Sequence, residues 1–170
     1  MSRKRKKLGS NVEIQGFFKL QIEDGPSGEI VGDSGWVRNM ITDTGFQHYI
    51  VQLMGNSAGS ARVTHAALGQ GTAPGSTATV LESEVTGSGS SNGRKAVTFS
   101  ETGSKTCQWV CTFGSADSFV TTTATIKNVG LFSTSTVGGG SIFAGNTYAT
   151  STVATNQNVN LTYQVRFATV

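Results

Sequence analysis

The second half of the chain consists of short segments in which apolar and polar residues alternate, separated by small polar residues. A period of two is typical of β-strands with one buried face, and Gly, Ser, Thr and Asn are the residues that form turns between such strands. Several short strands at this spacing predict an antiparallel sandwich or barrel-like sheet. The expected strands cover residues 94–101, 105–114, 118–132, 141–150 and 157–169.

The first half of the chain begins with a further strand. Residues 12–23 alternate, and their apolar members fall mostly on one face. Residues 24–28, with the sequence DGPSG, predict a turn, and a return strand is expected to begin at residues 29–31. Residues 36–40 continue the extended pattern. Residues 56–79 are expected to be mostly loop with one strand at 63–68, and residues 79–85 to form one helical turn.

One short helix is predicted between these strands. Thr44 and Gln47 have the spacing of a capping box, and Gly55-Asn56 is a typical helix end. Between them, apolar residues recur at helical spacing, which predicts about three turns lying across the mouth or edge of a sheet. These apolar residues are Phe46, Tyr49, Ile50 and Leu53.

Together these elements predict an all-β chain. The 170 residues are enough for one domain with a substantial core, and neither a repeat nor a second domain is detectable. We expect a single antiparallel β-sandwich or jelly-roll-like domain over residues 12–170, with one short α-helix, preceded by a basic N-terminal arm over residues 1–11. No run approaches the roughly 20 apolar residues of a membrane span, and no apolar segment follows the basic start as in a secretory signal.

Positive charge is concentrated at the start of the chain. Five of the thirteen Lys and Arg residues lie within residues 3–7, which leaves eight basic and ten acidic residues in the remainder. Such a segment can reach a phosphate backbone or an acidic protein surface, and the sequence leaves three roles open: a solubilising tail, docking on an acidic protein neighbour, and nucleic-acid contact. No aromatic residue is interleaved to stack on bases. The predicted partner-binding residues are Arg3, Lys4, Arg5, Lys6 and Lys7.

The two cysteines are expected to be free. Cys107 and Cys111 lie four residues apart on a predicted strand, which places them on one face about 13 Å apart. A disulfide requires Cα atoms within about 7 Å. We therefore interpret both as small buried apolar residues rather than as nucleophiles or metal ligands.

No constellation of residues predicts catalysis, a cofactor or a metal. Neither His48 nor His65 has a partner at metal-ligand spacing, and Glu82 and Glu84 are expected to be a solvated pair. The glycine-rich residues 69–75 are interpreted as a plain loop, because no strand there leads into a capped helix. Both tryptophans, Trp36 and Trp109, are expected in the core. The chain is therefore not expected to be an enzyme.

Three segments resemble a pattern found in small virion proteins of tailed bacteriophages. They are NMITDTGF at residues 39–46, ALGQGTAP at residues 67–74 running on to LESE at 81–84, and TIKNVGLF at residues 125–132. In that family the chain usually closes with a strand pair much like residues 141–150 and 158–167. The resemblance covers roughly residues 36–168. Because the apolar residues of the third segment do not alternate strictly, a bulge or kink is expected at Gly130.

This resemblance implies a structural role in a virion. Among such proteins, the size and all-β composition are most similar to capsid cement, or decoration, proteins. These are compact β-sandwiches or jelly rolls, often homotrimers, that bind the major capsid protein on the outer shell and stabilise it. The protein would be made in the host cytoplasm and would lie on the capsid surface, without catalysis, cofactor or membrane partner; the basic arm is less typical of this pattern.

Three alternatives remain open at this stage. The chain could instead be a tail, neck or fibre component of the same kind of virion. It could be a shell-forming coat protein whose basic arm contacts packaged nucleic acid, although the segments at residues 39–42 and 129–132 argue against this. A carbohydrate-binding β-sandwich is the last alternative, and it would need Trp36, Trp109 and a few tyrosines as a sugar platform.

Overall fold

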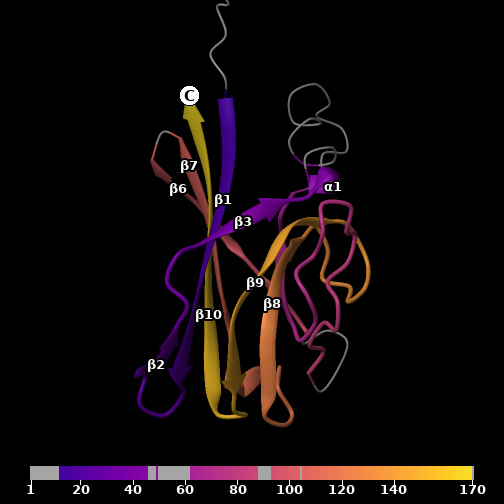
Figure 1. Ribbon diagram of the computed structural model, residues 1–170. Helices are drawn as coiled ribbons and strands as arrows, with labels where there is room; N and C mark the ends of the chain where they lie inside the picture. Colours follow the sequence, from indigo (N-terminus) through magenta and orange to yellow (C-terminus); the bar gives the residue numbers. More distant parts are fainter. Residues whose placement is uncertain (1–11, 46–48, 50–61, 88–92, 104, 170) are drawn as a thin grey trace, which may run out of the picture.

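The computed structural model describes residues 12–45, 49, 62–87, 93–103 and 105–169, and nearly all of its elements are strands (Figure 1). Every strand pair is antiparallel. In chain order the elements are β1 (Val12–Asp24), β2 (Ile30–Asp33), β3 (Val37–Ile41), α1 (Asp43–Gly45), β4 (His65–Gly69), β5 (Arg94–Ala96), β6 (Thr98–Gly103), β7 (Thr106–Phe113), a 3-10 turn (Ser115–Asp117), β8 (Ala124–Phe132), β9 (Ile142–Val153) and β10 (Gln157–Thr169).

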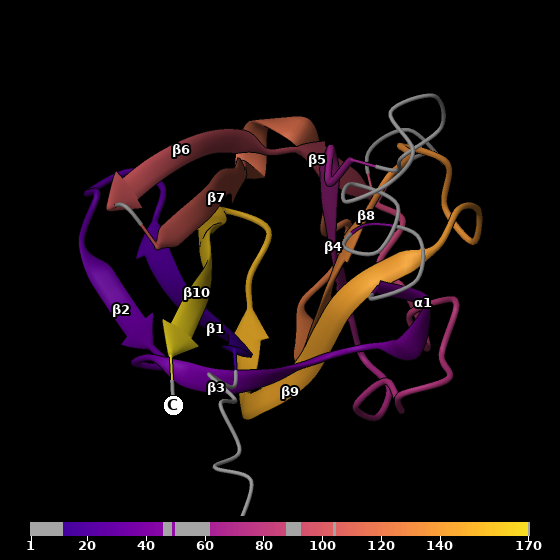
Figure 2. The same ribbon diagram turned by 90° about the horizontal axis from the view of Figure 1, so that it is seen from above.

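The strands form two layers joined at both edges. Their order is β5-β4-β8-β9-β3-β1-β10-β7-β6, and β2 pairs with β1 beside this path. The first layer contains β2, β1, β10, β7 and β6, and the second contains β5, β4, β8 and β9. Viewed from above, the sheet curls until its two ends lie next to each other (Figure 2). The predicted all-β, sandwich-like fold is thus confirmed, with a barrel-like closure.

The two edges close because the chain passes from one layer to the other at each of them. At one edge, β3 pairs first with β1 through Val37–Asn39 and then with β9 through Met40 and Ile41. At the other edge, β5 pairs with β4 and β6 pairs with β7, and only Val97 separates them. Strands that switch sheets in this way form the corners of packed sheets.

The main core lies between the two layers. In β1, the predicted alternation is confirmed, since Phe18, Leu20 and Ile22 are buried while the residues between them are partly exposed. The neighbouring strand β10 runs beside β1 over 13 residue pairs and contributes its own buried face. The side chains of this core include Phe18, Tyr49, Phe113, Phe119, Ile126, Leu131, Phe143, Leu161 and Tyr163.

A smaller core covers the outer face of the second layer. Ala67, Phe132 and Ile142 point away from the main core and are covered by Leu81 and Ala78 from the segment between β4 and β5. Consequently β4 and β8 are buried on both faces, which explains why their sequences are apolar without strict alternation. Phe132 belongs to this outer core.

The irregularity of β8 does not occur where the sequence predicted it. Gly130 is in register with Gly145, and the register shifts between Ile126 and Asn128 and again between Leu131 and Phe132. Across the first shift, β8 advances by two residues while β9 advances by four. Ile126, before this irregularity, and Val129 and Leu131, after it, share the main core although they do not alternate.

Two predicted elements differ from the structure, and a third is only partly described. Residues 79–85 form turns and a bridge between Gly69 and Glu84 instead of a helical turn. The strand expected at 118–132 begins only at Ala124. Of the predicted helix, the structure describes α1, in which Thr42 rather than Thr44 caps the start by accepting a bond from the Gly45 N–H at 2.9 Å. Most of its remaining residues lie outside the described part of the chain.

Candidate functional site

The predicted basic residues Arg3, Lys4, Arg5, Lys6 and Lys7 lie outside the described residues. The structure instead gives their point of attachment. Val12, where β1 begins, pairs with Thr169 at the end of β10, at the end of β1 that is opposite to β2 (Figure 1). The basic segment is thus joined to a strand that is paired from its first residue.

Side chains of both signs lie near this attachment point. The Arg38 Nη2 atom is 2.8 Å from the Glu13 Oε1 atom, and the two side chains are 67% and 40% exposed. On the neighbouring strand, the Arg166 guanidinium lies 5.0 Å from the centroid of the Phe17 ring. Through these contacts, the charged side chains of Arg38 and Arg166 lie against the outer face of the first layer.

Several large apolar side chains are exposed among the described residues. Trp36 is 48% exposed, so the prediction that it belongs to the core is wrong. Trp109, by contrast, packs against the main core, with its ring 5.9 Å from that of Tyr163. Isolated exposed apolar residues are normal, but contiguous ones are typical of contact surfaces. The exposed set is Ile30, Val31, Trp36, Met40, Val80, Phe99 and Phe167.

The two adjacent exposed residues of this set lie on β2. Ile30 and Val31 are 44% and 53% exposed. Within the described residues β2 pairs only with β1, so its other edge has no strand partner. An unpaired edge presents backbone N–H and C=O groups to any extended chain that approaches it. The edge of β2 is therefore a candidate contact surface.

Of the ion pairs among the described residues, the most deeply buried joins Arg94 to Glu84. The Arg94 Nε atom is 2.5 Å from Glu84 Oε1, and Arg94 Nη2 donates to Glu84 Oε2 at 3.0 Å. The side chains of Arg94 and Glu84 are 0% and 5% exposed. The prediction that Glu84 is solvated is therefore wrong, whereas Glu82 is exposed as expected.

The remaining bonds of this ion pair are made within the protein. Arg94 Nη1 donates to the carbonyl oxygens of Thr134 and Gly139, at 3.2 and 2.8 Å, and the guanidinium carbon lies 3.6 Å from the centroid of the Phe132 ring. Arg94 thus connects β5 with two loops that cover the second layer. Because its donors are directed at protein acceptors, we interpret this pair as structural.

A second buried polar contact ties the glycine-rich loop to β8. Asn128 Nδ2 donates to the carbonyl oxygens of Thr72 and Glu82, at 2.8 and 3.2 Å. The Glu82 carboxylate accepts bonds from the backbone and hydroxyl of Thr72, which lower the pKa of Glu82. The prediction that residues 69–75 form a plain loop is confirmed. The polar groups of this loop form hydrogen bonds within the protein that fix its shape.

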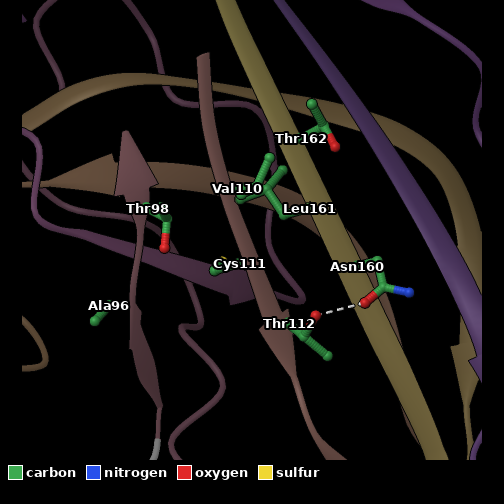
Figure 3. A pocket seen from close by; sticks show the side chains of 8 residues that line it. All are labelled: Ala96, Thr98, Val110, Cys111, Thr112, Asn160, Leu161 and Thr162. Atoms are coloured by element: carbon green, nitrogen blue, oxygen red, sulfur yellow. Dashed lines mark hydrogen bonds between the residues drawn. The ribbon is translucent and has the colours of Figure 1, made fainter. Parts of the chain in front are cut away.

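A shallow hollow lies beside the passage from β5 to β6, along β7 and β10 (Figure 3). Its volume is about 380 Å³, and no charged side chain lines it. The dashed line in Figure 3 marks the bond from Thr112 Oγ1 to Asn160 Oδ1, at 2.6 Å. With short aliphatic and hydroxyl side chains, this hollow offers little for acid–base or metal chemistry. Its lining consists of Ala96, Thr98, Val110, Cys111, Thr112, Asn160, Leu161 and Thr162.

Both cysteines are free, as the sequence predicted. They lie on β7 and pack against the main core, although neither is fully buried. Burial raises the pKa of Cys111 to about 12 and also raises the pKa of Cys107. Because the thiolate is the nucleophile and the metal ligand, these environments favour the unreactive thiol.

The described residues contain no group of three or more His, Cys, Asp and Glu side chains that could hold a metal ion. His65, at the start of β4, has its pKa lowered by burial and by the nearby Arg94 charge; His48 lies outside the described residues. No helix in the described part is long and apolar enough to cross a membrane.

Comparisons with known proteins found no family model, no curated protein and no solved structure that matches this chain.

Proposed function

We propose that this chain is a non-catalytic structural protein of a virion, of the kind represented by the capsid cement proteins of tailed bacteriophages. In this proposal it is made in the host cytoplasm, binds the outer face of the major capsid protein, and acts as a homo-oligomer, expected to be a trimer. Its task is to hold neighbouring shell subunits together.

The observation that carries this proposal is that hydrogen bonds join the segments of the resemblance to one another or to the closing strand pair. Thr42, from the first segment, donates its hydroxyl to the carbonyl oxygen of Ile142, in the closing pair, at 2.9 Å. Asn128, from the third, binds the backbone of Thr72 and Glu82 in the second. Residues that interlock in this way specify a fold. This supports treating the resemblance as a shared architecture rather than a chance series of turns.

The surface of the molecule fits a role in binding protein. Exposed apolar side chains on β2, β3 and β6 lie on a rigid two-layer scaffold, and a segment with five positive charges continues from β1. A clamp with several weak contacts gains affinity because each contact after the first is intramolecular. Binding only to the assembled shell would stabilise that shell by mass action.

A binding experiment with empty shells tests this proposal. Shells of the phage that encodes the chain, prepared without it, would be titrated with three proteins across a series of salt concentrations. The three are the full chain, a chain lacking residues 1–8, and a control in which residues 3–7 are all glutamine. We expect saturable binding by the full chain, and weaker, less salt-dependent binding by both variants, because each removes five charges.

Failure of the full chain to bind these shells would overturn the cement role. Identical affinity and salt dependence for all three proteins would restrict the contact to the β-domain. Gold-labelled antibodies on whole virions would then distinguish head from tail: label over the head at high copy number supports the proposal, whereas label over the tail, neck or fibres replaces it with the alternative role.

A further inference from the structure

The free edge of β2 is flanked by carboxylates. Glu23 and Asp24 end β1, Glu29 precedes β2, and Asp33 ends it. We call residues 23–33 the acidic hairpin. Among the ion pairs of the described residues, only Asp33 of these four has a cationic partner, Lys19, at 3.1 Å. The acidic hairpin therefore carries a net charge of −4, or −3 when Lys19 is counted with it, beside an unpaired edge with exposed Ile30 and Val31.

This edge lacks two of the residues that usually discourage pairing. Natural edge strands commonly carry lysine or proline, which hinder the approach of another strand. The sequence of β2 is IVGD, with no basic residue. Its exposed apolar pair and acidic flanks would favour an extended segment that is basic and can form backbone hydrogen bonds.

The chain itself contains one segment with this chemistry. Residues 3–7 are five consecutive basic residues, and no other run of basic residues longer than two occurs in the sequence. On an extended segment, alternate side chains point in opposite directions. Lysine and arginine side chains of residues 3–7 could therefore reach the carboxylates on both sides of the β2 edge.

The length of the chain decides which copy supplies the segment. β1 has 13 residues and so separates its two ends by about 40 Å. Even fully extended back along β1, the chain from Arg3 to Val12 spans at most about 32 Å, and from Lys7 at most about 18 Å. β2 pairs with Gln21–Glu23, about 30–36 Å along β1 from Val12, so only Arg3 could come level with Asp33 and residues 4–7 fall short. Residues 3–7 attached at Val12 thus cannot lie along the β2 edge of their own copy, which is near the far end of β1 (Figure 1).

We infer that the free edge of β2, with the acidic hairpin around it, receives the basic residues 3–7 of a second copy of this chain. The contact joins unlike surfaces, so it is heterologous. Heterologous contacts close into rings when the rotation between copies permits and otherwise extend into filaments. The inference concerns the purified chain and does not depend on a role in a virion.

Cross-linking between isotopically distinct copies tests this contact directly. Equal amounts of ¹⁵N-labelled and unlabelled full chain would be mixed, and a zero-length reagent would join lysines to nearby carboxylates. We expect peptides that join Lys4, Lys6 or Lys7 to Glu29 or Asp33, about half of them with one labelled and one unlabelled partner. Hairpin links found only within single copies, or links from residues 4–7 to other carboxylates alone, would overturn the inference.

Charge reversal supplies an independent test by sedimentation. Glu29→Lys changes an exposed side chain of the acidic hairpin, and Glu101→Lys makes the same charge change on an exposed residue of β6. We expect Glu29→Lys to weaken self-association about tenfold or more at low salt, while Glu101→Lys leaves it close to that of the parent chain. Equal effects of the two variants, or a parent chain that stays monomeric, would contradict the proposed contact.

A mixing experiment distinguishes a direct contact from a general charge effect. A chain with Lys4→Glu and Lys6→Glu has a nearly neutral basic segment and an unchanged acidic hairpin, whereas Glu29→Lys keeps its basic segment. We expect each variant alone to associate weakly and the mixture to form mixed dimers, since the basic segment of one variant meets the intact hairpin of the other. Absence of mixed dimers, with both variants folded by circular dichroism, would overturn the inference.

Discussion

Phe132 shows how one residue can connect the sequence pattern to the packing of the second layer. Its ring is fully buried, but it lies in the outer core under the Arg94 guanidinium and not between the two layers. In the sequence, Phe132 is only the last residue of the largely apolar segment at 125–132, and the sequence did not decide its burial. It could not predict which core the side chain would join, because that depends on the register shift next to it.

Replacing Phe132 by alanine should lower the free energy of unfolding by about 3–5 kcal/mol, because it leaves a cavity beneath a buried charged group. Urea unfolding followed by circular dichroism would measure this loss. Phe99→Ala is the matched control, since that ring is 53% exposed, and it should cost far less. Equal losses in the two variants would show that the ring of Phe132 is not held in the outer core.

Because the Cys111 thiol is largely buried, we expect the free energy of unfolding to fall in alkaline solution. Its pKa rises from 9.0 to about 12 on folding, because burial disfavours the thiolate. The unfolded chain therefore releases this proton at lower pH than the folded chain. The contribution is complete below about pH 9 and is lost as the pH rises from about 9 towards 12.

Urea unfolding at pH 7, 9 and 10.5 would measure this dependence. Cys107, Tyr49 and Tyr163 have pKa values shifted in the same direction, so the parent chain should lose stability over this range. Cys111→Val should show a smaller loss over the same interval, since it removes one of the four groups. A parent chain and variant with the same pH dependence would disprove the assignment.

At the scale of elements, the Arg94–Glu84 pair links β5 to the loops over the second layer. Its two residues are ten positions apart. Glu84 lies in a segment without regular periodicity and Arg94 begins a predicted strand, so no local pattern pairs them. The expectation of a solvated Glu84 followed from the polar residues around it in sequence. In the folded chain its environment is made by β5, β8 and the loop at residues 134–139.

Removing one partner of this pair should be strongly destabilising. We expect Arg94→Met to lower the free energy of unfolding by about 3–5 kcal/mol, because it leaves the Glu84 carboxylate buried and unpaired. The double variant Arg94→Met with Glu84→Leu should recover much of this loss. Arg38→Met breaks an exposed pair and should cost at most about 1 kcal/mol.

A denaturant titration of these four proteins tests the argument. If the double variant were less stable than Arg94→Met alone, the carboxylate would not be the source of the loss. If Arg38→Met cost as much as Arg94→Met, burial would not be the deciding factor.

At the scale of the whole molecule, we expect the β-domain to fold without the basic segment. Pairing begins at Val12, and the described contacts of β1 involve β2, β3 and β10. Deleting residues 1–8 should therefore leave the thermal midpoint of unfolding unchanged while removing the binding expected of residues 3–7. A calorimetric scan of both proteins would show this, and a clearly lowered midpoint would mean that the segment contributes to the fold.

The positions of strands were predictable because alternation along a strand is a local property. β1, β7 and β10 lie close to their expected ranges, and the all-β class follows from them. The start of β8 was misplaced because residues 118–123 have the composition of a strand without making a strand's hydrogen bonds.

What the amino-acid sequence alone determined is the list of strands, the free state of the cysteines and the separation of a basic segment from a nearly neutral body. Only the tertiary structure decided that β3 and the strand formed by β5 and β6 change layers and close the sheet. It also decided that Glu84 is buried and that Trp36 is exposed. The physical reason is that alternation reports which face of a strand is apolar. Partner strands and covering loops depend on contacts between residues far apart in the chain.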